Sequence, residues 1–202
     1  MCEELNIEYI SPAHDDVIVA LSRERELIPA AVTCPSEETC RITRSKSANY
    51  GVLADVVRVR KLYRIGGNID CYPVLVKPDK GQGSFGVKRV DGPDELAAAT
   101  KGLIDPIICE YLPGDEFTVH CFSARDRGIL SAKARSRHRI RNGVSVNSVS
   151  EDVHEVRALA ESINSILKLS GAWFFQLKRA RNGDLTLLEV APRIAGAMAT
   201  HK

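Results

Sequence analysis

The sequence lacks any long apolar run and any basic, then apolar, leader at its start. No stretch reaches the ~18 consecutive apolar residues that a membrane-spanning helix needs, and the chain opens with the acidic pair Glu3 and Glu4 instead of a signal peptide. A disordered chain is excluded as well, because 44% of the 202 residues are hydrophobic and 27% are charged. These features predict a folded, cytoplasmic protein without a membrane partner.

Cysteine pairs with the spacing of metal or redox motifs are missing. The six cysteines are Cys2, Cys34, Cys40, Cys71, Cys109 and Cys121, and the sequence contains no Cys-x-x-Cys motif. Several of them lie in apolar runs, where a thiol behaves as a small hydrophobic side chain. A disulfide or zinc framework is therefore disfavoured.

A net charge of +2 conceals one basic segment. Residues 125–141 hold seven Lys or Arg and one acid, so this segment carries +6 and the remainder of the chain −4. An extended strand would project five alternating cations from one face, namely Lys133, Arg135, Arg137, Arg139 and Arg141. Because no aromatic residues are interleaved for base stacking, a small anion is favoured over nucleic acid. A charged edge strand that resists aggregation is the other interpretation.

The order of apolar runs and turn residues predicts an α+β fold. Residues 6–10 read as a strand, and Asp15 and Asp16 begin a helix that ends before Pro29. This single βα unit cannot bury both faces of its strand, so residues 1–35 are interpreted as the remnant of a Rossmann-like domain. Further helices are expected over residues 36–53, 93–101 and 153–169, strands near residues 74–77, 87–90, 107–112, 117–124 and 129–139, and a closing hairpin over residues 172–190, mainly in antiparallel sheets.

Gly81, Gly83 and Gly86 form a glycine-rich loop. Their spacing matches a dinucleotide fingerprint, but that motif requires a helix directly after the glycines, and here a strand is predicted. A Walker loop is excluded because no Gly-Lys-Ser/Thr follows. The loop, flanked by Lys77 and Lys80, either folds over a triphosphate or is an ordinary turn with solvated lysines.

The closing hairpin carries a candidate cation site. Asn182 and Gly183 predict a two-residue type I′ turn, and counting back along both strands places Gln176 opposite Glu189. Two oxygen-bearing side chains that lie directly opposite each other could share a Mg²⁺ ion, which prefers oxygen ligands. The simpler alternative is a pair of polar side chains in water. The same count places Leu177 opposite Leu188 and Arg179 opposite Thr186.

Local sequence gives no nucleophile of the Ser-His-Asp or Cys-His kind. His120 lies in an apolar strand and is expected to be packed. His14 precedes a helix and is expected to cap it or to contact the neighbouring domain.

Three ordered motifs carry a family resemblance. They are Tyr72-Pro73-Val74-Leu75-Val76-Lys77-Pro78 with the loop that follows to Gly86, Glu110-Tyr111-Leu112-Pro113-Gly114-Asp115-Glu116-Phe117-Thr118-Val119, and Leu188-Glu189-Val190-Ala191-Pro192-Arg193. Together they resemble the ATP-grasp superfamily over about residues 5–202, with most similarity to the carbamoyl-phosphate synthetase large-subunit-like group. The resemblance implies two α+β subdomains that clasp ATP over residues 36–202, the smaller one spanning about residues 70–110 and carrying the glycine-rich loop.

The resemblance also implies roles for individual residues. The ATP-binding set is Lys46, Lys77, Lys80, Gly83, Ser84, Glu110, Tyr111, Leu112 and Glu116. In this set Lys46 is the first ATP-contacting cation, and Lys77 is the second, reaching the α-phosphate and the adenine side. Residues 80–86 form a flap over the phosphates, the backbone of residues 110–112 reads the adenine edge, and Glu116 accepts hydrogen bonds from the ribose hydroxyls. Gln176 and Glu189 match the Mg²⁺ ligands of such enzymes, and Mn²⁺ is the alternative ion. Arg193 and Arg141 resemble the cations at the γ-phosphate and the acidic substrate.

The implied reaction is activation of a carboxylate as an acyl-phosphate, followed by attack of an amine or similar nucleophile. Positioning and charge neutralisation supply most of the catalysis, which agrees with the missing nucleophile. Family members usually carry Asn where this chain has Ala191, so one metal ligand is lost. With short ends as well, the chain is interpreted as a fragment that has a companion subunit or further domains, and an ATP-binding module without turnover stays open beside the ligase.

Overall fold

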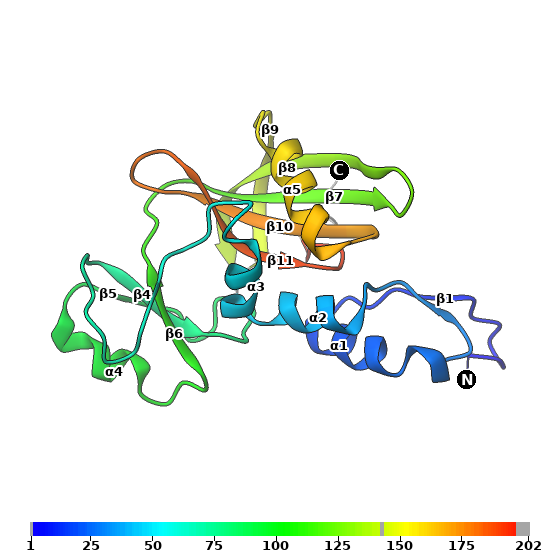
Figure 1. The fold of residues 1–202 in the computed structure, drawn as a ribbon, viewed down its shortest axis with the longest axis horizontal. Helices are drawn as coiled ribbons and strands as arrows, with labels where there is room; N and C mark the ends of the chain where they lie inside the picture. The colour runs from blue at the N-terminus through cyan, green and yellow to red at the C-terminus, as the bar shows by residue number, and fades with distance from the viewer. Residues whose placement is uncertain (1, 142–143, 197–202) are drawn as a thin grey trace.

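The computed structural model describes residues 2–141 and 144–196, and three β-sheets organise them (Figure 1). The strands are β1 (Tyr9–Ile10), β2 (Ala31–Val32), β3 (Leu62–Tyr63), β4 (Val74–Pro78), β5 (Lys88–Val90), β6 (Pro106–Glu110), β7 (Glu116–Ala124), β8 (Gly128–Arg141), β9 (Val144–Glu151), β10 (Gly171–Arg179) and β11 (Leu185–Ala191). The helices are α1 (Asp15–Arg23), η1 (Arg25–Leu27), α2 (Glu37–Arg44), α3 (Lys46–Leu53), η2 (Pro93–Glu95), α4 (Leu96–Thr100) and α5 (Val156–Leu167). The α+β prediction is confirmed.

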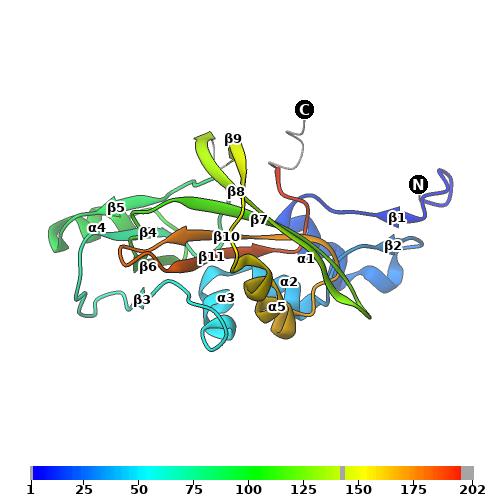
Figure 2. The same ribbon diagram turned by 90° about the horizontal axis from the view of Figure 1, so that it is seen from above.

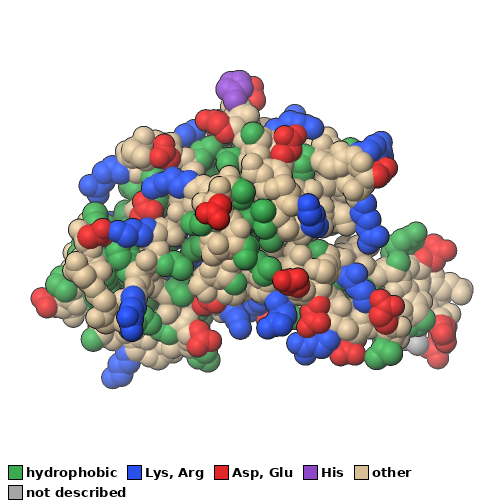
Figure 3. Space-filling view, in the orientation of Figure 1, with side chains coloured by type: hydrophobic (Ala, Val, Ile, Leu, Met, Phe, Trp, Pro, Cys, Tyr) green, Lys and Arg blue, Asp and Glu red, His purple; other side chains and the backbone are tan. Residues whose placement is uncertain are grey.

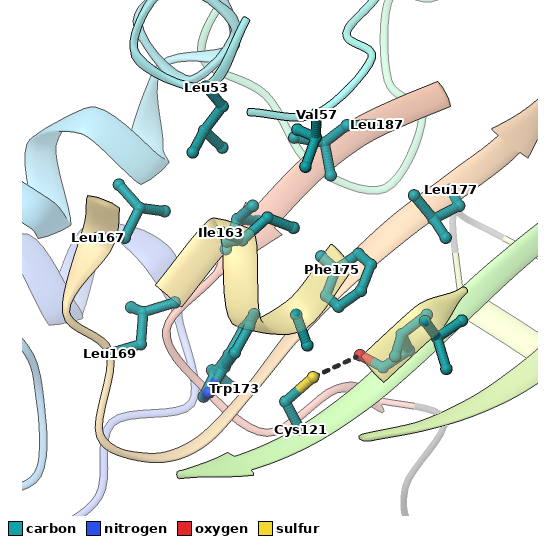
Figure 4. Packing of buried hydrophobic residues seen from close by; sticks show 14 of the residues in the cluster. Leu53, Val57, Cys121, Ile163, Leu167, Leu169, Trp173, Phe175, Leu177 and Leu187 are labelled. Atoms are coloured by element: carbon teal, nitrogen blue, oxygen red, sulfur yellow. Dashed lines mark hydrogen bonds between the residues drawn. The ribbon is translucent and has the colours of Figure 1, made fainter. Parts of the chain in front are cut away.

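The largest sheet has the order β11-β10-β7-β8-β9 and is antiparallel throughout. Side chains alternate between its faces, so Trp173, Phe175 and Leu177 of β10 enter the core while the residues between them face the other way. Helices α3 and α5 cover this core face (Figure 2). Figure 4 shows Leu53 of α3 and Ile163 of α5 packed over the strands. The opposite face is left for the site.

A four-stranded sheet of order β3-β6-β4-β5 lies at one end of the large sheet (Figure 1). Its own small core contains Val74, Val76 and Ile108, with Ala99 of α4 against them. The glycine-rich loop connects β4 to β5, and a strand follows it as predicted. This sheet therefore holds the loop at its edge.

The N-terminal part lies at the other end (Figure 1). Strands β1 and β2 form a two-stranded parallel pair, and α1 packs on α2. The side chain of His14 caps α1 by accepting a hydrogen bond from the amide of Asp16 at 3.3 Å, and its other ring nitrogen contacts Gln82 of the glycine-rich loop at 2.7 Å. The expectation for His14 is thus confirmed.

The single helix expected over residues 36–53 is wrong, because the chain forms two helices separated at Ser45. Ser45 has an extended backbone (φ −107°, ψ 123°), and its hydroxyl accepts a hydrogen bond from the amide of Ala48 to begin α3. The same hydroxyl donates to Asp79 at 2.6 Å. The break turns α3 so that Lys46 points toward the glycine-rich loop.

The pattern also missed three strands, β2, β3 and β9. Two are only two residues long, and β9 is rich in serine, so its apolar alternation is weak. Within the described residues no helix is long and apolar enough to cross a membrane.

Candidate functional site

A cleft separates the glycine-rich loop from the open face of the large sheet. It consists of two adjoining cavities of about 230 and 300 Å³. Both are lined by Gly81, Gln82, Gly83, Arg137, Gln176 and Glu189. Because the cavities share these six residues, they form one site under the loop.

The closing hairpin places Gln176 opposite Glu189, as predicted, but by a different route. The loop has three residues instead of two, since the amide of Ala180 donates to the carbonyl of Asp184 at 2.9 Å. Each pair near the turn is therefore shifted, and the predicted pairs Leu177–Leu188 and Arg179–Thr186 are wrong.

A β-bulge at Leu188 restores the register before Glu189. Leu177 pairs with Leu187, and the next pair is Gln176 with Glu189, so Leu188 is the extra residue. The bulge is stabilised on both sides of the strand. The Leu188 carbonyl accepts a hydrogen bond of 2.7 Å from Tyr50, and its side chain packs on Leu112 and Ala180.

Lys77 brings a buried positive charge to the cleft. Only 6% of the residue is exposed, and its ammonium donates to the Tyr50 hydroxyl at 3.2 Å and lies 5.6 Å from the centre of that ring. Burial lowers the pKa of Lys77 to about 8. An anion in the cleft would offset this desolvation.

Lys46 fixes the start of the glycine-rich loop. Its ammonium donates to the carbonyl oxygens of Gly81 at 3.0 Å and Asp79 at 3.2 Å. Burial lowers the pKa of Lys46, while the nearby Glu189 carboxylate acts in the opposite direction. Within the loop, Gly83, Ser84 and Gly86 have positive φ angles of 66°, 58° and 71°. Gly81, Gln82 and Gly83 of the loop line both cavities.

Glu116 begins β7 and is the acid that anchors two cations. Its carboxylate accepts from Arg137 of β8 and, at 3.5 Å, from Lys178 of β10. Gln176 and Lys178 are two residues apart on β10 and therefore share the cleft face. That spacing was a signal for Lys178 which the sequence analysis did not use.

Arg60 is a second cation that the sequence analysis missed. The segment around it joins the two larger sheets, since the amide of Leu187 donates to Arg58 and the amide of Glu110 donates to Lys61. Arg60 is 5% exposed and lines the cleft, and its Nε atom is buried with no hydrogen-bond partner in the described structure. A ligand oxygen would satisfy this orphaned donor.

Arg193 lies at the far side of the cleft, held by the N-terminal part of the chain. Its guanidinium forms two hydrogen bonds to Asp15, at 2.5 and 3.0 Å, and lies 5.1 Å from the ring centre of Phe174. Burial would lower the pKa of Arg193, but the hydrogen bond and charge of Asp15 raise it. Asp15, Phe174 and Arg193 all line the second cavity beside Glu189.

The first cavity therefore favours a polyanion bound with a hard cation. Its described lining contains the cations Lys46, Arg60, Lys77, Arg137 and Lys178 and the acids Glu116 and Glu189. Five cations against two acids leave an excess positive charge in a partly enclosed space, where it is weakly screened. The described residues hold no cluster of three His, Cys, Asp or Glu side chains that could bind a metal alone. Gln176 and Glu189 fit a Mg²⁺ ion that takes its other oxygen ligands from phosphate and water.

Comparison with known proteins agrees with this geometry. A family described as "ATP-grasp in the biosynthetic pathway with Ter operon" matches residues 104–201. The structure of a biotin carboxylase from Campylobacter jejuni superposes with a TM-score of 0.80 at 15% identity, covering 98% of this chain and 51% of that one. An L-amino acid ligase from Bacillus licheniformis gives a TM-score of 0.71 at 18% identity, over 93% and 49% of the two chains.

The chain has the ATP-grasp fold.

The two sequence relatives are ligases of greater length. A D-alanine–D-alanine ligase from Fusobacterium nucleatum is 28% identical over 104 residues, which are 52% of this chain and 33% of that protein. A second, from Halorhodospira halophila, is 35% identical over 71 residues, or 33% and 23%. The chain thus spans a third or less of the length of these relatives and about half of the length of the two solved structures.

Most residues assigned from the ATP-grasp resemblance meet in the cleft. They are Lys46, Lys77, Gly83, Ser84, Glu116, Gln176, Glu189 and Arg193. Their individual roles stay predictions, whereas their proximity is a property of the structure.

Four assigned residues do not line the cleft. Lys80 is exposed and lines a separate groove beside α1 and α2, because the chain reverses direction after Asp79. Glu110 pairs with Arg58 at 2.9 Å, and the Tyr111 ring lies 4.8 Å from the guanidinium of Arg89. Leu112 is buried beneath Leu188, which does line the cleft. The side chain of Arg141 lies outside the described residues.

The cleft receives only part of the basic row. Arg137 enters it, while Arg135 donates to Ser148 and Ser150 of β9. Register shifts after Arg137 interrupt the simple alternation assumed from the sequence. Ala191 is buried with Phe174 and Ala195, so its methyl group fills a small apolar cluster next to Glu189.

Proposed function

We propose that this chain is the Mg-ATP-dependent domain of a ligase that activates a carboxylate as an acyl-phosphate for attack by an amine or a similar nucleophile. The observation that carries the proposal is the pairing of Gln176 with Glu189 beneath the glycine-rich loop, among five cations. The relatives named as ligases support the same reaction class. The whole enzyme's activity rests on this proposal, because the chain spans only part of those relatives.

In the proposed reaction, the protein binds and orients charged groups. Lys46, Lys77 and Arg137 hold the ATP phosphates while a carboxylate oxygen attacks the γ-phosphorus, with ADP as the leaving group. The nucleophile then attacks the acyl carbon and inorganic phosphate departs. Fixed cations in a low-dielectric cleft stabilise the charge that develops, so no protein nucleophile is required.

Gln176 and Glu189 would hold Mg²⁺, which when bound neutralises phosphate charge and helps align the reacting oxygens. Their side-chain oxygens face the cleft from paired positions on β10 and β11. Mn²⁺ has the same preference for oxygen ligands and is proposed as an alternative ion. The buried Ala191 offers no ligand, so water would complete the coordination.

Arg193 and Arg137 would bind the acidic substrate in the second cavity. Both line it beside Phe174 and Glu189. The motifs resemble the carbamoyl-phosphate synthetase large-subunit-like group, which makes bicarbonate one candidate acid, whereas the ligase relatives make amino acids another. A companion subunit or further domains would complete the enclosure of the substrate, and a cytoplasmic location remains a prediction from the sequence.

Nucleotide titration and a screen for ADP release test the proposal. We expect the wild-type chain to bind ATP only with Mg²⁺ and both Lys77→Ala and Glu189→Ala to lose this binding. ADP release should then depend on one member of a panel of carboxylic acids and amines. Tight ATP binding by both variants would show that the site is assigned wrongly.

A binding module without turnover is the second candidate. Two features favour it. Ala191 stands where a metal ligand is expected, and the Arg193 guanidinium, expected to bind the substrate, is already paired with Asp15. This alternative predicts Mg-ATP binding with no ADP release for any acid and amine in the panel. The ligase proposal requires release with at least one pair.

A further inference from the structure

Two cysteine thiols meet in the N-terminal part of the chain, outside the cleft. Cys34 follows β2, Cys40 lies in the first turn of α2, and both are buried against Ile18. The Cys40 thiol donates to the carbonyl oxygen of Pro35 at 3.8 Å, and both cysteines belong to the same buried cluster. Five residues separate the two cysteines, so no short motif predicts the contact.

A guanidinium group is fixed against Cys34. Nη2 of Arg25 lies 3.0 Å from Cys34 Sγ and donates to the carbonyl oxygens of Cys34 at 2.9 Å and Pro35 at 2.5 Å. These carbonyl groups hold the cation beside the sulfur. A positive group in this position stabilises a thiolate over a thiol.

The pKa values of the two thiols are shifted in opposite directions. The hydrogen bond from Cys40, followed by the hydrogen bond and charge of Arg25, outweighs burial and lowers the pKa of Cys34 to about 6. The hydrogen bond to Cys34 and burial raise the pKa of Cys40. Burial alone raises the pKa of Cys121, which shows that the environment of Cys34 is unlike that of an ordinary core cysteine.

We propose that Cys34 and Cys40 form a hydroperoxide-sensitive dithiol, in which Cys34 attacks and Cys40 resolves. The Cys34 thiolate bonds to one peroxide oxygen, the O–O bond breaks, and the departing oxygen takes a proton, leaving a sulfenic acid. Cys40 sulfur then attacks the Cys34 sulfur, the S–O bond breaks, and water leaves with the proton from Cys40. The two thiols are oxidised by two electrons in total and the hydroperoxide is reduced.

The order of the two roles follows from access as well as charge. Cys34 retains 7% exposure against 1% for Cys40, so a small oxidant meets Cys34 first. Because neither cysteine lines the cleft, the reaction should proceed whether or not the chain binds ATP.

Peptide mass analysis of the full chain tests the disulfide directly. Trypsin cuts after Arg25 and Arg41, so residues 26–41 form one peptide that contains Cys34 and Cys40 and no other cysteine. We treat the native chain with hydrogen peroxide at a dose that oxidises the exposed Cys71, and then alkylate the remaining thiols. The peptide should carry no alkyl group and weigh two hydrogen atoms less than its reduced form, and dithiothreitol should reverse this. Two alkyl groups on the peptide at that dose would overturn the proposal.

Variants separate the roles of the groups. Cys40→Ser should leave a sulfenic acid on Cys34 that dimedone traps. Arg25→Gln should slow disulfide formation at pH 7 by about fivefold, because less of the thiol is ionised, whereas Arg23→Gln, which removes an exposed pair with Glu37, should not. Equal rates in the two Arg variants would contradict the role of Arg25. If Arg25→Gln fails to fold, the pH midpoint of Cys34 alkylation in the wild-type chain decides instead, with a value near 6 expected and one above 8 contradictory.

Discussion

Lys77 carries a buried ammonium group. Its burial costs desolvation free energy, which an anion bound beside it would offset. In the free chain burial lowers its pKa to about 8, and the Tyr50 hydroxyl is its one hydrogen-bond partner among the described contacts. A lysine of this kind destabilises the fold while it prepares a binding site. The same residue can therefore be tested for stability and for binding.

Replacing Lys77 with methionine should separate these two effects. The pKa shift corresponds to a cost of roughly 3–4 kcal/mol at neutral pH, so Lys77→Met should raise the free energy of unfolding by up to that amount and abolish ATP binding. Chemical denaturation and calorimetric titration measure the two quantities. Lys80→Met, at an exposed lysine outside the cleft, is the matched control and should leave ATP affinity within about twofold of wild type. Loss of ATP binding in the control would contradict the placement of Lys80.

The affinity for ATP should depend on pH through the same group. Phosphate binds the protonated lysine, so affinity should be highest below pH 8 and fall above it as Lys77 loses its proton. The free energy of unfolding changes in the opposite direction as the pH rises. Because the folded-state pKa is lower than the usual lysine pKa of 10.5, the unfolded chain binds more protons between pH 8 and 10.5, and the contribution of Lys77 to stability rises over that window. Lys77→Arg, which stays charged, should lose the decline in affinity near pH 8.

At the scale of elements, the glycine-rich loop depends on conformations that other residues tolerate poorly. Gly86 has φ +71°, and an added Cβ would lie 2.9 Å from Leu103 and 3.2 Å from Pro78. Gly81 has an ordinary φ, and an added Cβ there would make only normal contacts of 3.5 Å or more. The two glycines therefore have different structural roles in one loop.

Alanine at each glycine tests this difference. Gly86→Ala should lower the free energy of unfolding by about 1–2 kcal/mol and weaken ATP binding, because the backbone is strained and Leu103 must move. Gly81→Ala should change both quantities little. Thermal unfolding and ATP titration of the pair give the comparison, and equal effects of both substitutions would contradict the loop geometry.

For the basic row on β8, the sequence predicted which face the cations share but not the strand that pairs with them. Alternation correctly placed Arg135 and Arg137 on one face, but the partner strand β9 was not recognised. Arg135 donates to serines of β9, and Arg137 enters the cleft, where it donates to Glu116, so the row does not form a continuous, free cationic strip. We expect no tight, steeply salt-dependent binding of single-stranded DNA in a fluorescence titration. Such binding, lost on Arg135→Ala, would favour the nucleic-acid alternative instead.

In the hairpin that carries Gln176 and Glu189, the strand register could likewise be predicted only in part. Sequence located the hairpin and named the correct pair, but it assumed a two-residue turn and no bulge. Those two departures cancel by the time the strands reach Glu189. Local sequence could not reveal the bulge, because Tyr50 and Leu112 stabilise it from distant parts of the chain.

At the scale of the whole molecule, a contact between distant segments closes the cleft. Asp15 and Arg193 are 178 positions apart, and each side chain is less than one-fifth exposed. Arg60 likewise reaches the site through a segment that joins two sheets. Such residues cannot be found from spacing in the sequence, because only the tertiary fold brings them together. On the face drawn in Figure 3, basic and acidic side chains are intermingled.

Breaking the Asp15–Arg193 pair should cost more than breaking a neighbouring surface pair. Asp15→Asn leaves a partly buried guanidinium unpaired and should lower the free energy of unfolding by roughly 1–3 kcal/mol. The control Asp16→Asn removes an exposed carboxylate paired with Arg44 and should cost less than about 1 kcal/mol. Denaturation of the two variants gives the answer. A larger loss for Asp16→Asn would argue against the contact between the N-terminal part and the cleft.

The central claim is that Gln176 and Glu189 bind a divalent cation together with ATP between the glycine-rich loop and the large sheet. The most direct measurement is a crystal structure of the chain with Mn²⁺ and a non-hydrolysable ATP analogue, in which anomalous scattering locates the metal. We expect an anomalous peak for Mn²⁺ between the oxygens of Gln176, Glu189 and the phosphates, with Lys46 and Lys77 at the phosphate oxygens. A nucleotide bound elsewhere, or one bound in the cleft with the metal away from Glu189, would contradict it.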